Sequence, residues 1–463
     1  MIQLDDLLNA SGGRLFGAAV ATEFDAFCFD SRRIEPGQLF LAVRTDKGDG
    51  HDYIRAAIRG GATGLLCQEP LGLDDHPVTC IVVPDTERAL VSWAEYILRH
   101  HEAEVVAVTG SVGKTGTKEA LATVLSSRYR VFRNQGSYNG LFGLPIALGR
   151  LGNDHELAVL ELGSDHLGEI AELAALTRPR VGVVTAVSAA HLEALGSLDQ
   201  VAQEKGALVQ ALAPTGVAVL NWDDPLVRAM AERSAARVIT AGLEPGADVR
   251  ARQVRTGLSG TRFTMELDGE THEVSIPWLG RPRVFAALVA LAVGREFGLS
   301  MAEIVDRLAR LPWLAGRLNV LPAINGAILL DDTFNSSPAA AAAALDFLAE
   351  LDVPGRKIAV LGNMHQLGAH SAEEHARIGQ QAAQVVDMLV AKGELATEIG
   401  RAAEAAGLPA ERVLYAFSTD EVVRHFTGDG RGWSPLCKGD VVLVKGSALT
   451  RLERVSLKLL ANQ

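Results

Sequence analysis

Residues 105–120 read VVAVTGSVGKTGTKEA, and this stretch decides the fold. An apolar run rich in valine passes into a glycine loop, and a helical pattern begins directly after the loop. At such a junction the backbone N–H groups of the loop point at phosphate oxygens, helped by the positive end of the helix. We expect Lys114 to reach the terminal phosphates of a nucleotide and the Thr115 hydroxyl to bind Mg²⁺.

The loop is a variant of the usual G-x-x-x-x-G-K-[ST] pattern. Val108 stands where the first glycine would fall, and glycine comes instead at Gly110. The alternative interpretation is a plain glycine turn, but a lysine and a hydroxyl in the required context favour phosphate binding. The residues expected to bind the nucleotide are Thr109, Gly110, Ser111, Val112, Gly113, Lys114, Thr115 and Gly116.

On both sides of this loop, short β-branched runs alternate with longer helical patterns, which is typical of α/β proteins. We predict three α/β domains, covering residues 1–84, 85–312 and 313–463. The central domain, with the phosphate loop, is expected to hold a parallel sheet with crossover helices, and the C-terminal domain to be Rossmann-like. Residues 250–276 alternate more densely and contain several glycines, which predicts an antiparallel extension.

Composition and charge exclude several classes of protein. The 463 residues are 48% apolar and 22% charged, as in soluble globular proteins, and the net charge of −12 argues against a nucleic-acid partner. No apolar run is long enough to span a bilayer, and the amino terminus lacks the regions of a signal peptide. The four cysteines show no C-x-x-C spacing, so neither a zinc site nor a disulfide framework is indicated. We expect a cytoplasmic monomer.

The variant loop resembles the ATP loop of the Mur ligases, which build the peptide of the bacterial cell wall, and the resemblance covers most of the chain. Residues 29–66 include FDSRRIEPGQLFLAV and DGHDYIRAAIRGGATGLL, which are similar to the UDP-sugar-binding domain of this family. The resemblance implies that Asp30, Ser31 and Arg32 hold the uridine diphosphate end of the substrate. The residues alone would favour a solvated turn.

Three further motifs resemble the metal-binding part of the family's active site: Glu161-Leu162-Gly163, His191-Leu192-Glu193 and Glu204-Lys205-Gly206. Glu161 closes an apolar strand, at the edge where ligands gather in parallel sheets. The resemblance implies that Glu161 and His191 bind a second Mg²⁺. It also implies that Lys205 is carbamylated and that the carbamate is a metal ligand. Taken alone, His191 reads as a satisfied polar residue and Lys205 as a solvated surface charge.

In the third domain, Gly316-Arg317-Leu318 and the run DDTFNSSP at residues 331–338 resemble the Gly-Arg and Asp-Asp-x-Tyr-Asn-Ala-Asn-Pro motifs of the family. The resemblance implies that Arg317 places a permanent charge on the terminal phosphate and that Asp332 binds the ribose or positions the nucleotide. Asn335 would contact the substrate. One departure concerns the base: the adenine-contacting asparagine of the motif Arg-His-Asn-Val-Tyr-Asn-Ala falls at Ala286.

The resemblance therefore implies an ATP-dependent ligase that uses ATP and Mg²⁺, with UDP-N-acetylmuramoyl-tripeptide and D-alanyl-D-alanine as substrates. The tripeptide carboxylate would attack the γ-phosphate to give an acyl phosphate, from which the amine displaces phosphate. Lys114, His191, Lys205 and Arg317 would be the catalytic residues. Three alternatives remain open: a Mur-like or folylpolyglutamate-synthase-like ligase with a different amine or acceptor, a phosphate-loop kinase, and a nucleotide-binding protein without activity.

Overall fold

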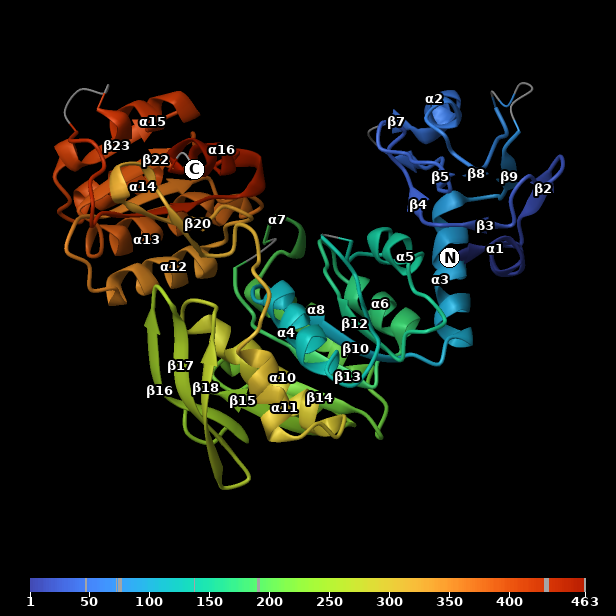
Figure 1. The fold of residues 1–463 in the computed structure, drawn as a ribbon, viewed down its shortest axis with the longest axis horizontal. Coiled ribbons are helices and arrows are strands. Elements are labelled where there is room, and N and C mark those ends of the chain that lie inside the picture. Colours follow the sequence, from blue (N-terminus) through green and yellow to red (C-terminus); the bar gives the residue numbers. More distant parts are fainter. Residues whose placement is uncertain are drawn as a thin grey trace.

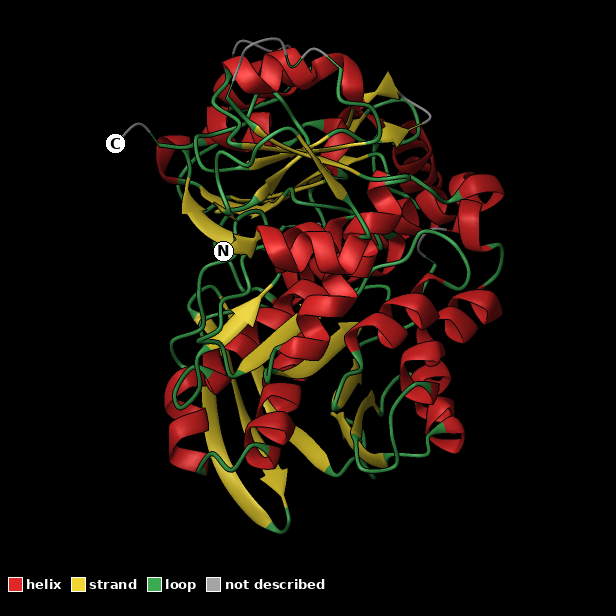
Figure 2. Ribbon diagram, turned by 90° about the vertical axis from the view of Figure 1, so that its right-hand side faces the viewer, coloured by secondary structure: helices red, strands yellow, loops and turns green. Residues whose placement is uncertain are grey.

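The computed structural model describes residues 1–45, 48–71, 73, 77–136, 138–189, 192–428 and 433–461. Three main sheets follow one another along the chain, and the unit that contains the second sheet lies between the other two (Figure 1). Helices lie against these sheets and strands occupy the interior (Figure 2). The predicted α/β class is confirmed. No helix within the described ranges combines the length and the apolarity needed to cross a membrane.

The first unit is built on a five-stranded sheet in the order β2-β9-β8-β5-β4, in which only the edge strand β2 is antiparallel to its neighbour. Two short two-stranded ribbons, β1 with β3 and β6 with β7, flank this sheet. The elements are β1 (Ile2–Gln3), α1 (Leu4–Ser11), β2 (Arg14–Phe16), β3 (Glu23–Phe24), β4 (Phe27–Cys28), β5 (Leu39–Leu41), β6 (Arg44–Thr45), β7 (Gly48–Asp49), α2 (Ile54–Arg59), β8 (Gly64–Cys67), β9 (Thr79–Val82) and α3 (Thr86–His100).

The second unit holds nine strands in the order β11-β12-β10-β13-β14-β15-β16-β17-β18. Pairing is parallel from β11 to β16 and antiparallel from β16 to β18, so the predicted extension of the parallel sheet is confirmed. The strands are β10 (Glu104–Thr109), β11 (Val131–Arg133), β12 (Leu157–Glu161), β13 (Val181–Val184), β14 (Val217–Asn221), β15 (Arg237–Gly242), β16 (Val249–Gly257), β17 (Gly260–Leu267) and β18 (Glu270–Ile276). The helices are α4 (Lys114–Leu125), α5 (Gly143–Leu148), α6 (Glu169–Thr177), α7 (Leu192–Leu195), α8 (Leu198–Gln210), α9 (Pro225–Arg228), α10 (Pro282–Glu296) and α11 (Met301–Leu308).

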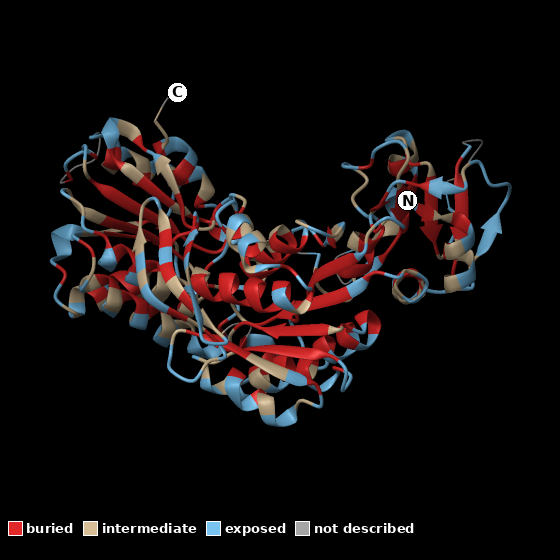
Figure 3. Cartoon of the chain, turned by 60° about the horizontal axis from the view of Figure 1, so that its bottom comes forward, coloured by how far each residue is buried: buried red, intermediate tan, exposed pale blue. Residues whose placement is uncertain are grey.

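Strand β10 shows why the valine run forms a central strand. Successive side chains of a strand point to opposite faces, so both faces of a fully apolar strand must be covered. Val106 and Val108 belong to the core that includes α4 and α10, whereas Val105 and Ala107 belong to the core that includes α3 and α6. Buried residues follow the strands of the sheet accordingly (Figure 3). The second of these cores continues into the first unit, so the first two units share one apolar interior.

The third unit has a six-stranded sheet in the order β19-β20-β24-β21-β22-β23, parallel except for β19. Strands β19 and β23 lie at its two edges, and each is four residues long. The elements are β19 (Asn319–Pro322), β20 (Ile328–Asp332), α12 (Pro338–Glu350), β21 (Lys357–Gly362), α13 (Ser371–Ala383), β22 (Met388–Lys392), α14 (Thr397–Ala405), β23 (Val413–Ala416), α15 (Thr419–Thr427), β24 (Val441–Lys445) and α16 (Glu453–Leu459).

The connection between the second and third units is anchored on both sides of a short free stretch. Trp278 Nε1 donates a hydrogen bond to the Pro312 carbonyl (2.8 Å), which holds the start of the connection to the second unit. Phe334 N donates to the Gly316 carbonyl (3.1 Å), which holds its end to the third unit. Trp313, between these anchors, is 62% exposed. The connection is therefore hydrogen-bonded to both units, with Trp313 exposed between them.

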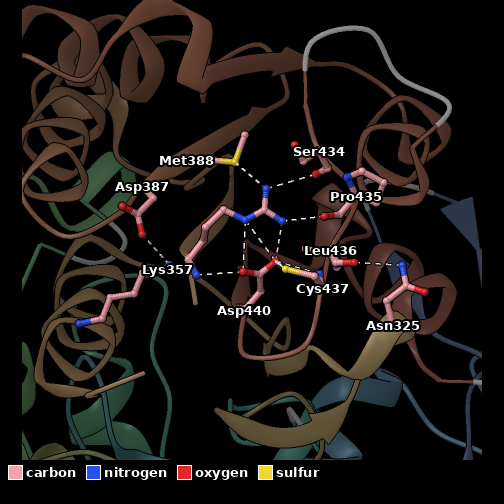
Figure 4. A network of polar contacts seen from close by, with 10 residues as sticks. Asn325, Lys357, Asp387, Met388, Ser434, Pro435, Leu436, Cys437 and Asp440 are labelled. Atoms are coloured by element: carbon pink, nitrogen blue, oxygen red, sulfur yellow. Dashed lines mark hydrogen bonds and ion pairs between the residues drawn. The ribbon is translucent and has the colours of Figure 1, made fainter. Parts of the chain in front are cut away.

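A buried ion pair stabilises the third unit where β24 begins (Figure 4). Arg356 donates to both carboxylate oxygens of Asp440 and to the carbonyls of Ser434 (3.2 Å) and Pro435 (2.7 Å). The Cys437 backbone N–H donates to the same carboxylate (2.9 Å). The Asp440 side chain is only 1% exposed, and its burial alone would raise the pKa, but the hydrogen bonds from Arg356 and from backbone N–H groups outweigh burial and lower the pKa to about 2.

Replacing Asp440 by alanine should lower the free energy of unfolding by about 1.5–3 kcal/mol, because it removes the charge-assisted hydrogen bonds from Arg356 and from backbone N–H groups. In the wild-type protein the pKa of Asp440 is about 2, below its ordinary value of 3.8. The stabilisation is therefore present above pH 4 or so and is lost as the pH falls toward the folded-state pKa. Urea unfolding at a series of pH values, followed by circular dichroism, measures both effects.

The matched control is Glu398→Ala, which breaks the exposed Arg401–Glu398 ion pair of the same unit. Exposed pairs contribute little, so this variant should lose less than about 1 kcal/mol. An Asp440→Ala protein as stable as the Glu398→Ala protein would show that the buried pair does not hold the unit together.

Candidate active site

A cavity of about 510 Å³ lies between the second and third units, and we call it the interdomain cavity. Its walls are the carboxyl ends of strands from both sheets, the edge at which ligands bind in parallel α/β proteins. The predicted site residues that line it are Ser111, Val112, Gly113, Lys114, Thr115, Gly116, Glu161, Arg317, Asp332 and Asn335. Ala286, the place of the expected base contact, also lines it.

The glycine loop is fitted closely between neighbouring strand ends. Gly110 has a φ of +139°, and a Cβ atom there would lie 2.1 Å from Thr185 Oγ1, so only glycine fits. Ser111 N donates to the Ala186 carbonyl (2.8 Å), and Thr109 Oγ1 donates to the Leu162 carbonyl (2.9 Å). Thr109 and Gly110 thus lie behind the cavity wall and fix the loop, while residues 111–116 form the wall itself.

Lys114 and Arg317 bring two cations to this loop. Lys114 Nζ donates to the Gly110 carbonyl (2.6 Å), and burial lowers the pKa of its ammonium group. Arg317 approaches from the third unit: Arg317 Nη2 donates to Thr115 Oγ1 (3.2 Å), and its guanidinium lies 4.0 Å from the centre of the Phe334 ring. Burial lowers the pKa of Arg317 as well. An anion at the amino end of α4 would therefore meet charges from both units.

Glu161 lies at the end of β12 with half of its hydrogen-bonding capacity in use. Its Oε1 accepts from Asn139 Nδ2 (2.8 Å), whereas its buried Oε2 has no hydrogen-bond donor among the described residues. The nearest cation is Lys118, whose Nζ lies 4.0 Å from Oε2. A buried carboxylate oxygen without a donor is costly, and a hard divalent cation would satisfy it. Glu161 therefore fits the predicted second Mg²⁺ site, and the Thr115 hydroxyl, predicted to bind the first Mg²⁺, lines the same cavity. His191 lies outside the described residues.

Lys205 is buried, and the interpretation as a solvated surface charge is wrong. Its side chain is 3% exposed, and its Nζ donates to Ser164 Oγ (2.5 Å), a residue of the cavity wall. Burial, followed by repulsion from Lys114, lowers the pKa of Lys205 to about 7. The adjacent Glu204 accepts from the N–H groups of Gly168 and Ile170 and so fixes the loop before α6. A lysine that is partly neutral near pH 7 is suited to covalent modification.

The third unit also contributes a buried ion pair to the cavity. Lys445, at the end of β24, forms a buried ion pair with Asp332 (2.7 Å) and donates to the Asn335 carbonyl (3.0 Å). Lys445 is not among the residues predicted for the site. Asn139, Lys118 and Arg283 were also missed, since a lone amide or cation on a predicted loop or helix carries no signal of burial.

Asp30, Ser31 and Arg32 lie in the first unit and do not line the interdomain cavity. Arg32 donates to both carboxylate oxygens of Asp30 (2.9 and 2.8 Å), which lowers the pKa of that carboxyl to about 2. The Arg32 side chain is 87% exposed. The turn therefore presents a planar cation to solvent at a place separate from the phosphate loop.

Family models match the chain in three consecutive parts. The Mur ligase family catalytic domain matches residues 25–129, the Mur ligase middle domain residues 108–294, and the Mur ligase glutamate ligase domain residues 316–448. The UDP-N-acetylmuramoyl-tripeptide–D-alanyl-D-alanine ligase of Escherichia coli is 35% identical, covering 86% of this chain and 87% of that protein. Its Bacillus subtilis counterpart is 30% identical, covering 92% and 91%.

Solved structures agree with these matches. MurF from Acinetobacter baumannii superimposes with a TM-score of 0.85 and 26% identity, over 99% of this chain and 98% of that one. The MurF ligase of Thermotoga maritima in complex with ADP superimposes with a TM-score of 0.80 and 28% identity, over 94% and 96%. Because sequence and fold agree along nearly the whole length, the chain belongs to the Mur ligase family.

Proposed function

We propose that this enzyme is an ATP-dependent ligase that adds D-alanyl-D-alanine to UDP-N-acetylmuramoyl-tripeptide during the synthesis of peptidoglycan precursors. The observation that carries the proposal is the convergence of Lys114, Thr115 and Arg317 at one end of α4, beside the unsatisfied oxygen of Glu161. The names of the Escherichia coli and Bacillus subtilis relatives support this choice of substrates.

The residues of the cavity divide the chemistry among them. Lys114 and Arg317 neutralise the phosphate charge that grows as the carboxylate attacks, and they do so in a buried setting where electrostatic stabilisation is strong. Thr115 would hold one Mg²⁺, and Glu161 with His191 would hold a second; such ions lower the charge on the phosphate oxygens when they are bound. Lys205, as a carbamate, would add an anionic ligand on the side of Ser164.

Each domain has a separate task in this proposal. Residues 1–84 bind the UDP end of the acceptor through Asp30, Ser31 and Arg32, and residues 85–312 bind ATP. Residues 313–463 bind the amine, with Asn335 at the cavity wall and Asp332 placed to take the ribose. A reactive acyl phosphate formed between two units is protected from water when they meet.

The proposed reaction is tested by ADP release in the presence of UDP-N-acetylmuramoyl-tripeptide and a panel of dipeptides and amino acids. ADP release should depend on the tripeptide substrate and be fastest with D-alanyl-D-alanine. Multiple-turnover release of a phosphorylated acceptor, at a rate that added amines do not change, would identify a kinase instead. Preference for another amine would identify a Mur-like ligase with a different substrate.

The variant Arg32→Ala should raise the KM for the UDP substrate about 10-fold or more, because a charge-assisted hydrogen bond contributes about 1.5–3 kcal/mol. The KM for ATP should change less than about 2-fold, since Arg32 does not line the interdomain cavity. Arg59→Ala, which removes an exposed cation from the end of α2, is the control. Equal effects of Arg32→Ala on the two constants would remove the assignment of the UDP site.

A further inference from the structure

One cation of the interdomain cavity has no role in the mechanism above. Arg283 lies in the first turn of α10, and its side chain lines the cavity. Its guanidinium rests against α4: a Cβ atom built at Gly116 would lie 2.6 Å from Arg283 Nη1. A glycine inside a helix costs about 1 kcal/mol relative to alanine. Gly116 leaves the space that the guanidinium of Arg283 occupies, within the first turn of the phosphate-loop helix.

The contacts of Arg283 do not account for its charge. Arg283 Nη2 makes one long hydrogen bond, to the Arg317 carbonyl (3.4 Å). The Cζ atom of its guanidinium lies over the Trp278 ring, 5.6 Å from the ring centre. Among the described residues no carboxylate lies within ion-pair distance of Arg283, and the nearby Asp332 is already paired with Lys445. The group is therefore a half-buried cation that has no ion-pair partner of its own among the described residues.

The surroundings of Arg283 add to the positive charge. Burial, followed by repulsion from Arg317, lowers the pKa of Arg283 to about 10. Arg317 donates to Thr115, the residue before Gly116, so the two guanidinium groups meet the same turn of α4. Lys114 begins this turn, and the positive end of the helix dipole points the same way. Glu161 and Asp332 offset part of this charge, but the three cations that converge on the helix amino end still repel one another, and a bound anion would relieve that repulsion.

We propose that Arg283 is a second phosphate-binding arginine of this site, which contacts the phosphate chain of the nucleotide together with Arg317. The inference rests on the proposed use of ATP but not on the identity of the acceptor or the amine. A planar guanidinium binds phosphate oxygens through two parallel N–H groups, which lysine cannot reproduce. Because Arg283 comes from the second unit and Arg317 from the third, the nucleotide is gripped from both sides of the cavity.

Binding of ADP to the ligand-free enzyme, measured by calorimetry without acceptor or amine, tests this directly. Arg283→Met should raise the Kd for ADP about 10-fold or more, and the dependence of log Kd on log salt should become shallower. The Kd of Arg283→Lys for ADP should lie between that of Arg283→Met and that of the wild type. The control is Arg295→Met, which removes an exposed cation from the last turn of the same helix and should stay within about 2-fold of the wild type.

Thermal unfolding separates this role from a structural one. Removing one of three repelling cations should leave the ligand-free Tm of Arg283→Met unchanged or raised, while the rise in Tm caused by ADP shrinks. A structural arginine would give the reverse: a lower ligand-free Tm with the same salt dependence of ADP binding. Either that result or a Kd within 2-fold of the wild type would overturn the proposal.

If Arg283→Met does not fold, Arg283→Lys and Arg283→Gln decide by the same measurements. If the wild-type protein binds ADP but does not ligate D-alanyl-D-alanine, the proposed function is contradicted and the inference about Arg283 is unaffected.

Discussion

Replacing Lys114 by alanine should lower the rate of ADP release about 10³-fold or more at saturating ATP. Lys114 is the cation of the phosphate loop itself, and loss of one such stabilising group from a buried site commonly costs 10²–10³-fold in rate. Its only hydrogen-bond partners among the described residues are the carbonyls of Gly110 and Ser111. Because burial already disfavours the charged form, the fold should not depend on this side chain, and the Tm should be kept.

The control for Lys114→Ala is Lys458→Ala, which removes an exposed lysine that pairs with Asp420 on the surface of the third unit. This control should release ADP at the wild-type rate. Near wild-type turnover of the Lys114→Ala enzyme would show that the lysine does not act on the phosphates. A fall in Tm of many degrees would show a structural role instead.

Lys205→Ala should lose activity about 100-fold or more and regain part of it when acetate or another short-chain carboxylate is added. In the proposed modification, the neutral amine of Lys205 attacks CO₂, a proton is released, and an N-carboxylate remains. Its oxygens are of the hard type that Mg²⁺ prefers. Burial makes this step accessible near neutral pH, because it lowers the pKa of Lys205 to about 7. The carboxylate in the rescue experiment would occupy the space left by the side chain.

Lys205→Arg provides the matched control, because arginine keeps the positive charge of an unmodified lysine but leaves no space for an added carboxylate. This variant should be inactive and should not be rescued. Full activity of Lys205→Ala would end the carbamate proposal. Equal rescue of both variants would show that the added carboxylate acts elsewhere.

The parts of the fold that could be predicted are those whose signal is local. The run from Val105 to Thr115 specifies a buried strand, a turn that needs glycine and a helix start within a few residues, and the structure has all three. Glu161 was found for the same reason, since it ends an apolar strand. The four-residue edge strands β19 and β23 carry little periodicity of their own.

The parts of the site that could not be predicted depend on contacts between distant segments. Lys445 and Asp332 are 113 residues apart and form one buried pair. Arg283 comes 167 residues after Gly116, the glycine against which it rests, and nothing in its own helix indicates that contact. The burial of Lys205 likewise depends on Ser164, in another loop. A charged side chain on a helix gives the same local pattern whether it faces water or an active site.

The anchored connection around Trp313 has a consequence for unproductive ATP hydrolysis. Arg317 belongs to the third unit, because the carbonyl of the neighbouring Gly316 accepts a hydrogen bond from Phe334 N of that unit. In this structure the arginine reaches Thr115 across the junction of the two units, and we expect that contact to be lost if the units separate. A nucleotide held by the second unit alone then lacks one of the charges that its reaction needs. We therefore expect phosphoryl transfer to require the third unit, which is also the domain proposed to bind the amine.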